Sequence, residues 1–127
     1  MVQESQGYRD LRVWQLAMEL IPKVYQVVKQ LPSEERYELG SQLRRAVVSV
    51  AANIAEGQAR QHTKEFLQSL YIARGSLAET ETLLMVAERL GYLPAPTLQA
   101  LVAELAELRK PLQGLVNRLH GQRSTGN

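Results

Sequence analysis

The side chains with the clearest capacity for chemistry in this sequence are its cations. The chain of 127 residues has 15 Lys and Arg against 13 Asp and Glu, a net charge of +2, and 11 of its 15 cations are Arg. The planar guanidinium of Arg suits phosphate and carboxylate recognition. A charge of +2 does not by itself indicate a nucleic-acid binder. A symmetric oligomer, however, would repeat any basic patch and strengthen its field.

We expect these cations to contact a phosphate backbone without reading its sequence. The candidates open the first predicted helix, flank the second, bracket the linker after it and mark the last helix: Arg9, Arg12, Arg44, Arg60, Lys64, Arg109, Lys110 and Arg118. The alternative interpretation, the commoner fate of such charges, is a solvated surface with salt bridges.

Nucleophiles and metal ligands are scarce. The sequence has no Cys, which excludes a disulfide framework, a thiolate metal site and a cysteine nucleophile. His62 and His120 have no second His or carboxylate at metal-ligand spacing. Neither Ser49 nor Ser76 has a His placed to activate it. We therefore predict a protein with no catalytic site, no metal and no cofactor.

Polar residues recur at helical spacing along one edge of the second predicted helix. With a carboxylate from the third helix, this set comprises Gln42, Arg45, Ser49, Asn53, Glu56 and Glu79. Arg45 and Glu56 lie about three turns apart, so each needs a partner on another helix, such as Glu79 for Arg45. We interpret the set as an interhelical or intersubunit network that fixes register. The alternative is that some of these groups line a ligand or RNA surface.

The elements that position these groups are helices. Apolar residues recur with a period of 3.6 and predict helices over residues 10–31, 34–57, 64–90 and 96–120. Ser33 and Thr63 are expected N-caps, and Gly91 is an expected C′ residue. Pro22 and Pro111 fall inside helices, where each removes a backbone hydrogen bond and should bend the axis. Short connections make neighbouring helices antiparallel, so the prediction is an all-α, up-down four-helix bundle.

The length favours a single domain over residues 1–127, with a core at residues 8–120 and a flexible tail at 121–127. The polar N-terminus is not a secretory signal. No apolar run reaches the ~18–20 residues of a membrane span. With the absence of Cys, these features favour the cytoplasm.

The second helix is apolar on more sides than a bundle core requires. Residues 46–55 are interrupted only by Ser49 and Asn53. Residues that point away from the expected core stripe are assigned to an oligomer interface: Val47, Val48, Ala51, Ala52 and Ala55. A wet, alanine-rich helix is the alternative, but it does not explain the two valines. On this assignment, Val47→Asp should break the oligomer.

Several segments resemble one known family. They are YRDLRVWQLA at 8–17, LGSQLRRA at 39–46, Ser49, NIAEG at 53–57, ARGSLAE at 73–79 and LGY at 90–92. Together they resemble the four-helix bundle family named for proteins encoded in intervening sequences of bacterial 23S rRNA genes. The resemblance covers about residues 8–120. It implies a homopentameric ring of bundles. It also implies kinship with the accessory variability proteins of diversity-generating retroelements, basic pentamers that bind a reverse transcriptase and template RNA.

Three hypotheses for function follow. The first is a non-enzymatic, pentameric accessory protein that binds nucleic acid, in particular RNA, through its cations, with a reverse transcriptase as a further partner. The second is a protein-interaction scaffold that does not bind nucleic acid directly, which an exposed apolar groove would favour. The third is an enzyme, which would need a pocket with converging titratable groups.

Overall fold

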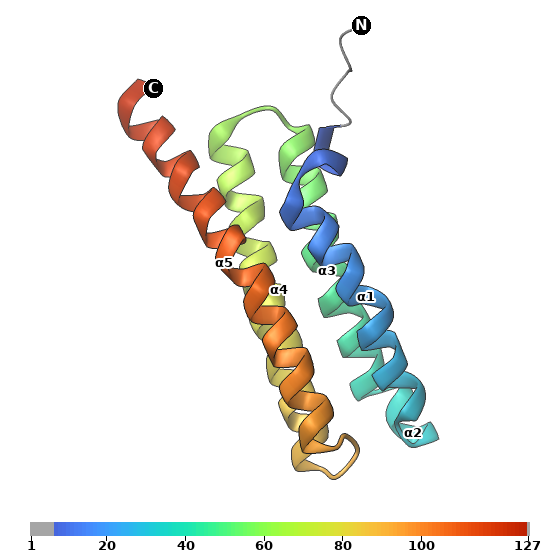
Figure 1. Ribbon diagram of the computed structural model, residues 1–127. Helices are drawn as coiled ribbons and strands as arrows, with labels where there is room; N and C mark the ends of the chain where they lie inside the picture. The colour runs from blue at the N-terminus through green and yellow to red at the C-terminus, as the bar shows by residue number, and fades with distance from the viewer. Residues whose placement is uncertain (1–6, 127) are drawn as a thin grey trace, which may run out of the picture.

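The computed structural model describes the backbone of residues 7–126 and the side chains of residues 7–122. Four long helices lie side by side: α1 (Arg12–Gln30), α3 (Leu39–Ala59), α4 (Thr63–Arg89) and α5 (Ala95–Gly126) (Figure 1). A 3₁₀ turn, η1 (Gly7–Asp10), precedes α1, and a single helical turn, α2 (Ser33–Arg36), joins α1 to α3. The prediction of an all-α four-helix bundle is confirmed. None of the described helices is both long and apolar enough to cross a membrane.

The helices differ from the prediction in two respects, the division of the second helix and the residues at the cap positions. The second predicted helix is divided into α2 and α3 by a break at Tyr37 and Glu38. Just after the break, Gly40 lies close to α1, where a Cβ on Gly40 would lie 2.9 Å from Val28 Cγ1. Ser33 and Thr63 are the first residues of their helices and not their caps, since Pro32 and His62 occupy the cap positions without a side-chain hydrogen bond.

The end of α4 confirms the role expected for Gly91. Its φ is +83°, in the left-handed region that Gly adopts without strain. The N–H of Gly91 donates to the Glu88 carbonyl at 3.0 Å, and the N–H of Tyr92 donates to the Ala87 carbonyl at 2.9 Å. These two bonds form a Schellman motif, which satisfies carbonyls that the helix end would otherwise leave unpaired.

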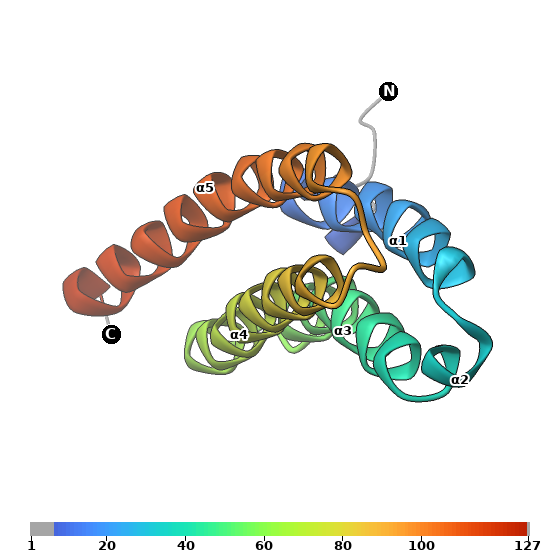
Figure 2. The same ribbon diagram turned by 90° about the horizontal axis from the view of Figure 1, so that it is seen from below.

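Both internal prolines lie within continuous helices, Pro22 in α1 and Pro111 in α5. Pro111 has no N–H for the Glu107 carbonyl, and α5 curves along its length so that its C-terminal half leaves α1 (Figure 2). Contrary to expectation, α5 does not end near residue 120 but continues to Gly126, through most of the predicted tail. Asn127 and residues 1–6 of the predicted domain lie outside the described residues.

The position of α3 corrects part of the interface assignment. This helix packs against α1 on one side and α4 on the other, so two of its sides are buried within one chain. Val47 is 0% exposed and Ala51 is 4% exposed, and both belong to the hydrophobic core. Their assignment to an oligomer interface was wrong. Val48, which is 40% exposed, and Ala52 face outward, and Ala55 is half-buried.

Candidate nucleic-acid interface

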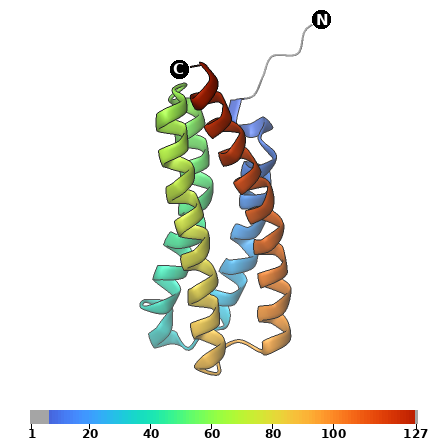
Figure 3. The same cartoon turned by 90° about the vertical axis from the view of Figure 1, so that its left-hand side faces the viewer.

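One end of the bundle gathers several predicted phosphate ligands. The start of α1, the turn between α3 and α4 and the end of α5 all lie at this end (Figures 1 and 3). Arg9 lies in η1, Arg12 begins α1, Arg60 follows α3 and Lys64 lies in the first turn of α4. The topology therefore brings together cations from two separate parts of the chain, residues 9–12 and residues 60–64.

Carboxylates compensate part of this basic end. Arg60 donates a hydrogen bond to Glu56 at 2.8 Å and lies 3.8 Å from Glu65. The hydrogen bond to Glu56, with the charges of Glu56 and Glu65, raises the pKa of Arg60. Arg12 lies 3.9 Å from Glu19. Within residues 7–122, Arg9 and Lys64 form no ion pair, so they are the cations of this end that can still meet a phosphate.

The remaining predicted ligands lie elsewhere. Arg109 is half-buried and pairs with Glu81 of α4. Arg44 lies toward the opposite end of α3 and donates to the Arg36 carbonyl at 3.4 Å. Lys110 and Arg118 are exposed on α5 and form no ion pair with any described residue. The structure thus does not unite all the predicted ligands in one patch.

A surface that sequence reasoning missed runs along α4 and α5. The N-terminal half of α4, residues 66–78, lies beside the C-terminal half of α5, residues 108–122, because the two helices are antiparallel (Figure 1). Neither segment contains Asp or Glu, and both contain Arg. We call these paired segments the acid-free face. The signal was present in the sequence, since no acid lies between Glu65 and Glu79 and none follows Glu107.

A cluster of polar and aromatic side chains crosses the acid-free face. Arg74 donates to Gln113 Oε1 at 2.9 Å, and Gln113 Nε2 donates to Asn117 Oδ1 at 3.0 Å. The Tyr71 hydroxyl hydrogen-bonds His120 Nε2, and the two ring centroids lie 5.9 Å apart. The guanidinium of Arg74 lies 5.0 Å from the centroid of the Tyr71 ring. We call these five residues the α4–α5 cluster.

The polar network predicted on α3 is smaller than expected. Ser49 Oγ and Ser76 Oγ are 2.9 Å apart, across the contact between α3 and α4. Asn53 Nδ2 donates to the Ser49 carbonyl at 2.8 Å and to Ser49 Oγ at 2.9 Å. These three residues hold α3 and α4 in register, with Ser76 an unpredicted member.

The other members of the predicted network lie outside it. Arg45 and Glu79 are exposed, and no ion pair joins them among the described side chains. Gln42 is also exposed. Glu56 pairs with Arg60 on its own side of the bundle and not with another helix. The edge of α3 is thus divided into a half-buried interhelical part and a solvated part.

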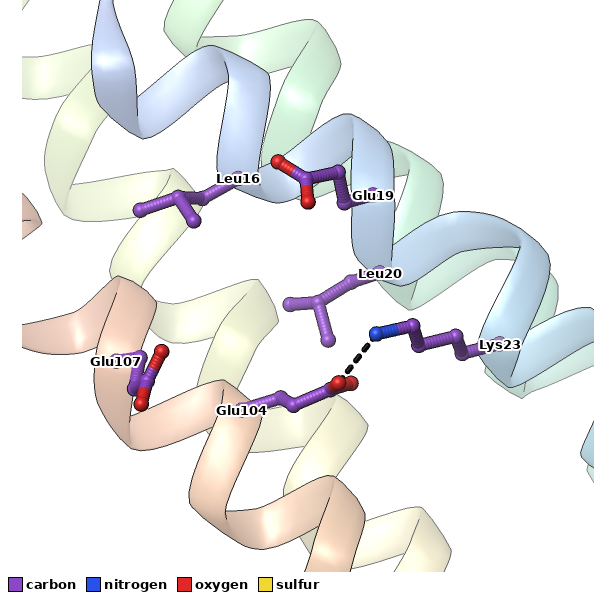
Figure 4. A pocket seen from close by; sticks show the side chains of 6 residues that line it. All are labelled: Leu16, Glu19, Leu20, Lys23, Glu104 and Glu107. Atoms are coloured by element: carbon purple, nitrogen blue, oxygen red, sulfur yellow. Dashed lines mark hydrogen bonds and ion pairs between the residues drawn. The ribbon is translucent and has the colours of Figure 1, made fainter.

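A small pocket between α1 and α5 is lined by three glutamates and one lysine. Leu16, Glu19, Leu20 and Lys23 of α1 face Glu104 and Glu107 of α5 (Figure 4). Lys23 pairs with Glu104, whose Oε2 is buried without a hydrogen-bond partner. Across the described residues, no group of three or more His, Asp or Glu could hold a metal ion. The Lys23–Glu104 pair links α1 to α5.

The family model for the 23S rRNA-intervening sequence protein matches residues 9–114. No curated protein matches the chain. A crystal structure from Bacteroides thetaiotaomicron, described as a protein with unknown function from the S23 ribosomal protein family, is similar, with 25% sequence identity and a TM-score of 0.75. The match covers 82% of this chain and 97% of that chain.

Proposed function

The chain belongs to the 23S rRNA-intervening sequence protein family, and on that premise we propose that it is a non-enzymatic accessory protein that binds RNA through the acid-free face. The observation that supports this proposal is the pairing of two helix segments without Asp or Glu. Arg74, Lys110 and Arg118 lie on these segments, are exposed and form no ion pair with a described residue. A surface with unpaired cations and no acids attracts phosphate, and no carboxylate competes with the phosphate for these cations.

Arg9 in η1 and Lys64 at the start of α4 add cations that are unpaired among the described residues, at the end of the bundle where α5 finishes (Figure 3). Arg12 and Arg60 contribute less, since each already has a carboxylate within 4 Å. Arg109 and Arg44 have structural partners, so we assign them supporting roles. The phosphate contacts of the proposed site are therefore concentrated in the unpaired cations.

Self-association would repeat this surface. In the proposed assembly, a cytoplasmic homopentamer, the outward residues of α3 meet a neighbouring copy. The exposed Val48, together with Ala52 and Ala55, gives that side of α3 an apolar surface with small side chains. Small residues allow helices to approach closely, and a closed ring would bring several copies of the acid-free face to one RNA.

A second candidate function is a scaffold for a protein partner such as a reverse transcriptase. One observation favours it. An apolar groove on the outer side of α4 is lined by Thr82, Met85, Val86, Arg89 and Leu90, and Leu90 is 54% exposed. Exposed apolar side chains gathered in this way are typical of protein contacts.

The test is a binding titration of a structured RNA at graded salt concentrations. If phosphate contacts dominate, the logarithm of the association constant should fall linearly with the logarithm of the salt concentration, with a slope of about −0.7 to −0.9 for each phosphate contacted. Absence of binding at low salt would refute the proposal and favour the scaffold. Binding that does not change with salt would refute the electrostatic mechanism.

A further inference from the structure

The α4–α5 cluster differs in kind from the lysine and arginine patches around it. It combines a phenol ring, an imidazole, a guanidinium and two amides on a surface without acids: Tyr71, Arg74, Gln113, Asn117 and His120. Tyr71 is 36% exposed, and Arg74 and His120 are also exposed. Contact with phosphate alone would require only the cations, so the rings and amides need a separate explanation.

Arg74 is held in one orientation by neutral groups only. Its Nη1 donates to the amide oxygen of Gln113, and its guanidinium lies over the Tyr71 ring. Elsewhere in residues 7–122, Arg12, Arg60 and Arg109 each have a carboxylate partner. Arg74 has none among the described residues, so it keeps its full charge in a fixed position. An oriented guanidinium loses little conformational entropy when it binds a planar ligand.

The groups beside Arg74 offer stacking surfaces and hydrogen bonds. The Tyr71 and His120 rings are tilted by 39° and linked through the phenol hydroxyl, which fixes both. Asn117 accepts from Gln113 through Oδ1, so its NH₂ group can donate elsewhere. Unpaired RNA bases are recognised by stacking on aromatic rings and guanidinium planes and by amides that bond their edges. Bases in the interior of a duplex are already stacked on both sides by neighbouring base pairs, so they cannot stack on protein side chains.

We propose that the α4–α5 cluster binds an unpaired nucleotide of RNA, with its base against the Tyr71 and Arg74 planes and its phosphate near the cations of α5. This inference rests on the proposed function and specifies the class of RNA, since it predicts a preference for single-stranded or looped segments over duplex. The cluster also bridges α4 and α5, so an effect on folding has to be separated from an effect on binding.

The test compares two probes, a single-stranded RNA of mixed sequence and the blunt duplex that contains the same strand. The variants are Tyr71→Leu, which removes the stacking ring, and Arg74→Lys, which keeps the charge but removes the plane. Tyr25→Leu on α1 is a matched control, because Tyr25 has the same exposed fraction of 36% and lies on another helix. Arg89→Lys, at the other end of α4, is the control for Arg74→Lys.

Wild-type protein should bind the single strand more tightly than the duplex. Tyr71→Leu should weaken binding of the single strand about tenfold, the size expected for loss of one stacked base, and leave duplex binding unchanged. Arg74→Lys should act in the same direction, and the control variants should bind as wild type does. Tyr71→Phe, which keeps the ring and loses the bond to His120, should retain single-strand binding.

Four outcomes would overturn the inference. Equal weakening of single-strand and duplex binding by Tyr71→Leu would make the cluster a structural link between helices, as would loss of binding that follows a lowered Tm. Unchanged binding by all the variants, with normal salt dependence, would leave the proposed function intact and remove this site from it. No binding of either probe by the wild type would refute both.

Discussion

Gly57 of α3 and Ser69 of α4 mark a point where the two helices approach too closely for another side chain. A Cβ on Gly57 would lie 2.6 Å from Ser69 Cβ and 3.1 Å from Phe66 Cδ1. Both Gly57 and Ser69 are buried. Gly57 also ends the NIAEG segment, so this contact gives a physical reason for glycine at that place.

We predict that Gly57→Ala destabilises the protein. Overpacking costs about 1–3 kcal/mol, and the better helix propensity of Ala returns at most about 1 kcal/mol. Gly75→Ala in α4 is the matched control, because its Cβ position has no neighbour within 4 Å beyond the adjacent residues and the local helix backbone. This control should raise stability by about 0.5–1 kcal/mol. Thermal or urea unfolding measures both, and a stabilised Gly57→Ala would contradict the close approach.

A second prediction separates folding from assembly on α3. Val47→Asp places a carboxylate in the core, where Val47 is 0% exposed, and should cost about 4 kcal/mol or more. Val48→Asp, one residue away and 40% exposed, should leave the monomer folded. If the outward side of α3 is an interface, light scattering will show a smaller particle for Val48→Asp. An unchanged mass with a normal Tm would refute that interface.

The third prediction concerns the hydrogen bonds that join α3 to α4. A double-mutant cycle with Ser49→Ala and Ser76→Ala should give a coupling energy of about 0.5–1.5 kcal/mol, because their hydroxyl oxygens are 2.9 Å apart. Ser41→Ala with Ser76→Ala is a suitable control, since no hydrogen bond joins these two described side chains. Urea unfolding supplies the free energies. A coupling near zero would show that the bond adds nothing to stability.

The fourth prediction is a pH effect at the connection between α4 and α5. A hydrogen bond to Glu35, with burial and the nearby charges of Glu35 and Glu34, raises the pKa of Tyr92 above its ordinary value of 10.0. Since the folded pKa is the higher one, the stabilising contribution is complete below the ordinary value. It is lost as the pH rises through the raised pKa of Tyr92.

Ultraviolet titration of phenolate formation can detect this shift. Glu35→Gln should lower the pKa of Tyr92 toward 10.0, because the amide lacks the negative charge of the carboxylate. Tyr92→Phe identifies the affected phenol by its absence from the difference titration. Glu38→Gln, a carboxylate that does not contribute to the shift, serves as the control. Superimposable titrations of wild type and Glu35→Gln would contradict the assignment.

The fifth prediction tests the acid-free face. Lys110→Gln should weaken RNA binding and reduce the magnitude of the salt slope by roughly 0.7–0.9, the effect of losing one phosphate contact. Lys29→Gln removes the same charge from an exposed lysine at the end of α1. It should change neither affinity nor slope by a comparable amount. Equal effects of the two variants would indicate attraction by net charge and no defined face.

The long helices were predictable because their apolar residues repeat every 3.6 positions over many turns. The break between α2 and α3 was not, since neither Tyr37 nor Glu38 is a helix breaker, and the close approach of Gly40 to Val28 just after the break depends on how α1 and α3 pack. The apolar character of α3 was also correctly identified. Whether Val47 is covered by another subunit or by helices of its own chain depends on where α1 and α4 pack around α3. The period of the apolar residues alone does not determine that packing.

The candidate site was predictable only as a list of cations. Whether a cation is available depends on distances between helices, as the pairing of Arg109 with Glu81 shows. Arg74 and Tyr71 were missed because each is unremarkable within α4. They become a cluster only when the register between α4 and α5 brings Gln113 and His120 opposite them. The absence of Asp and Glu from both segments, in contrast, can be read directly from the sequence.

The burial of α3 on two sides has an evolutionary consequence. A helix with one dry face can accept substitutions around most of its circumference, whereas α3 lies between α1 and α4 and has little outward surface. Gly40 and Gly57 limit it further, since each sits where a Cβ would come within 3 Å of a neighbouring side chain. We therefore expect α3 to tolerate fewer substitutions than the other long helices. The outer surface of α5 is where new binding properties can arise without loss of the fold.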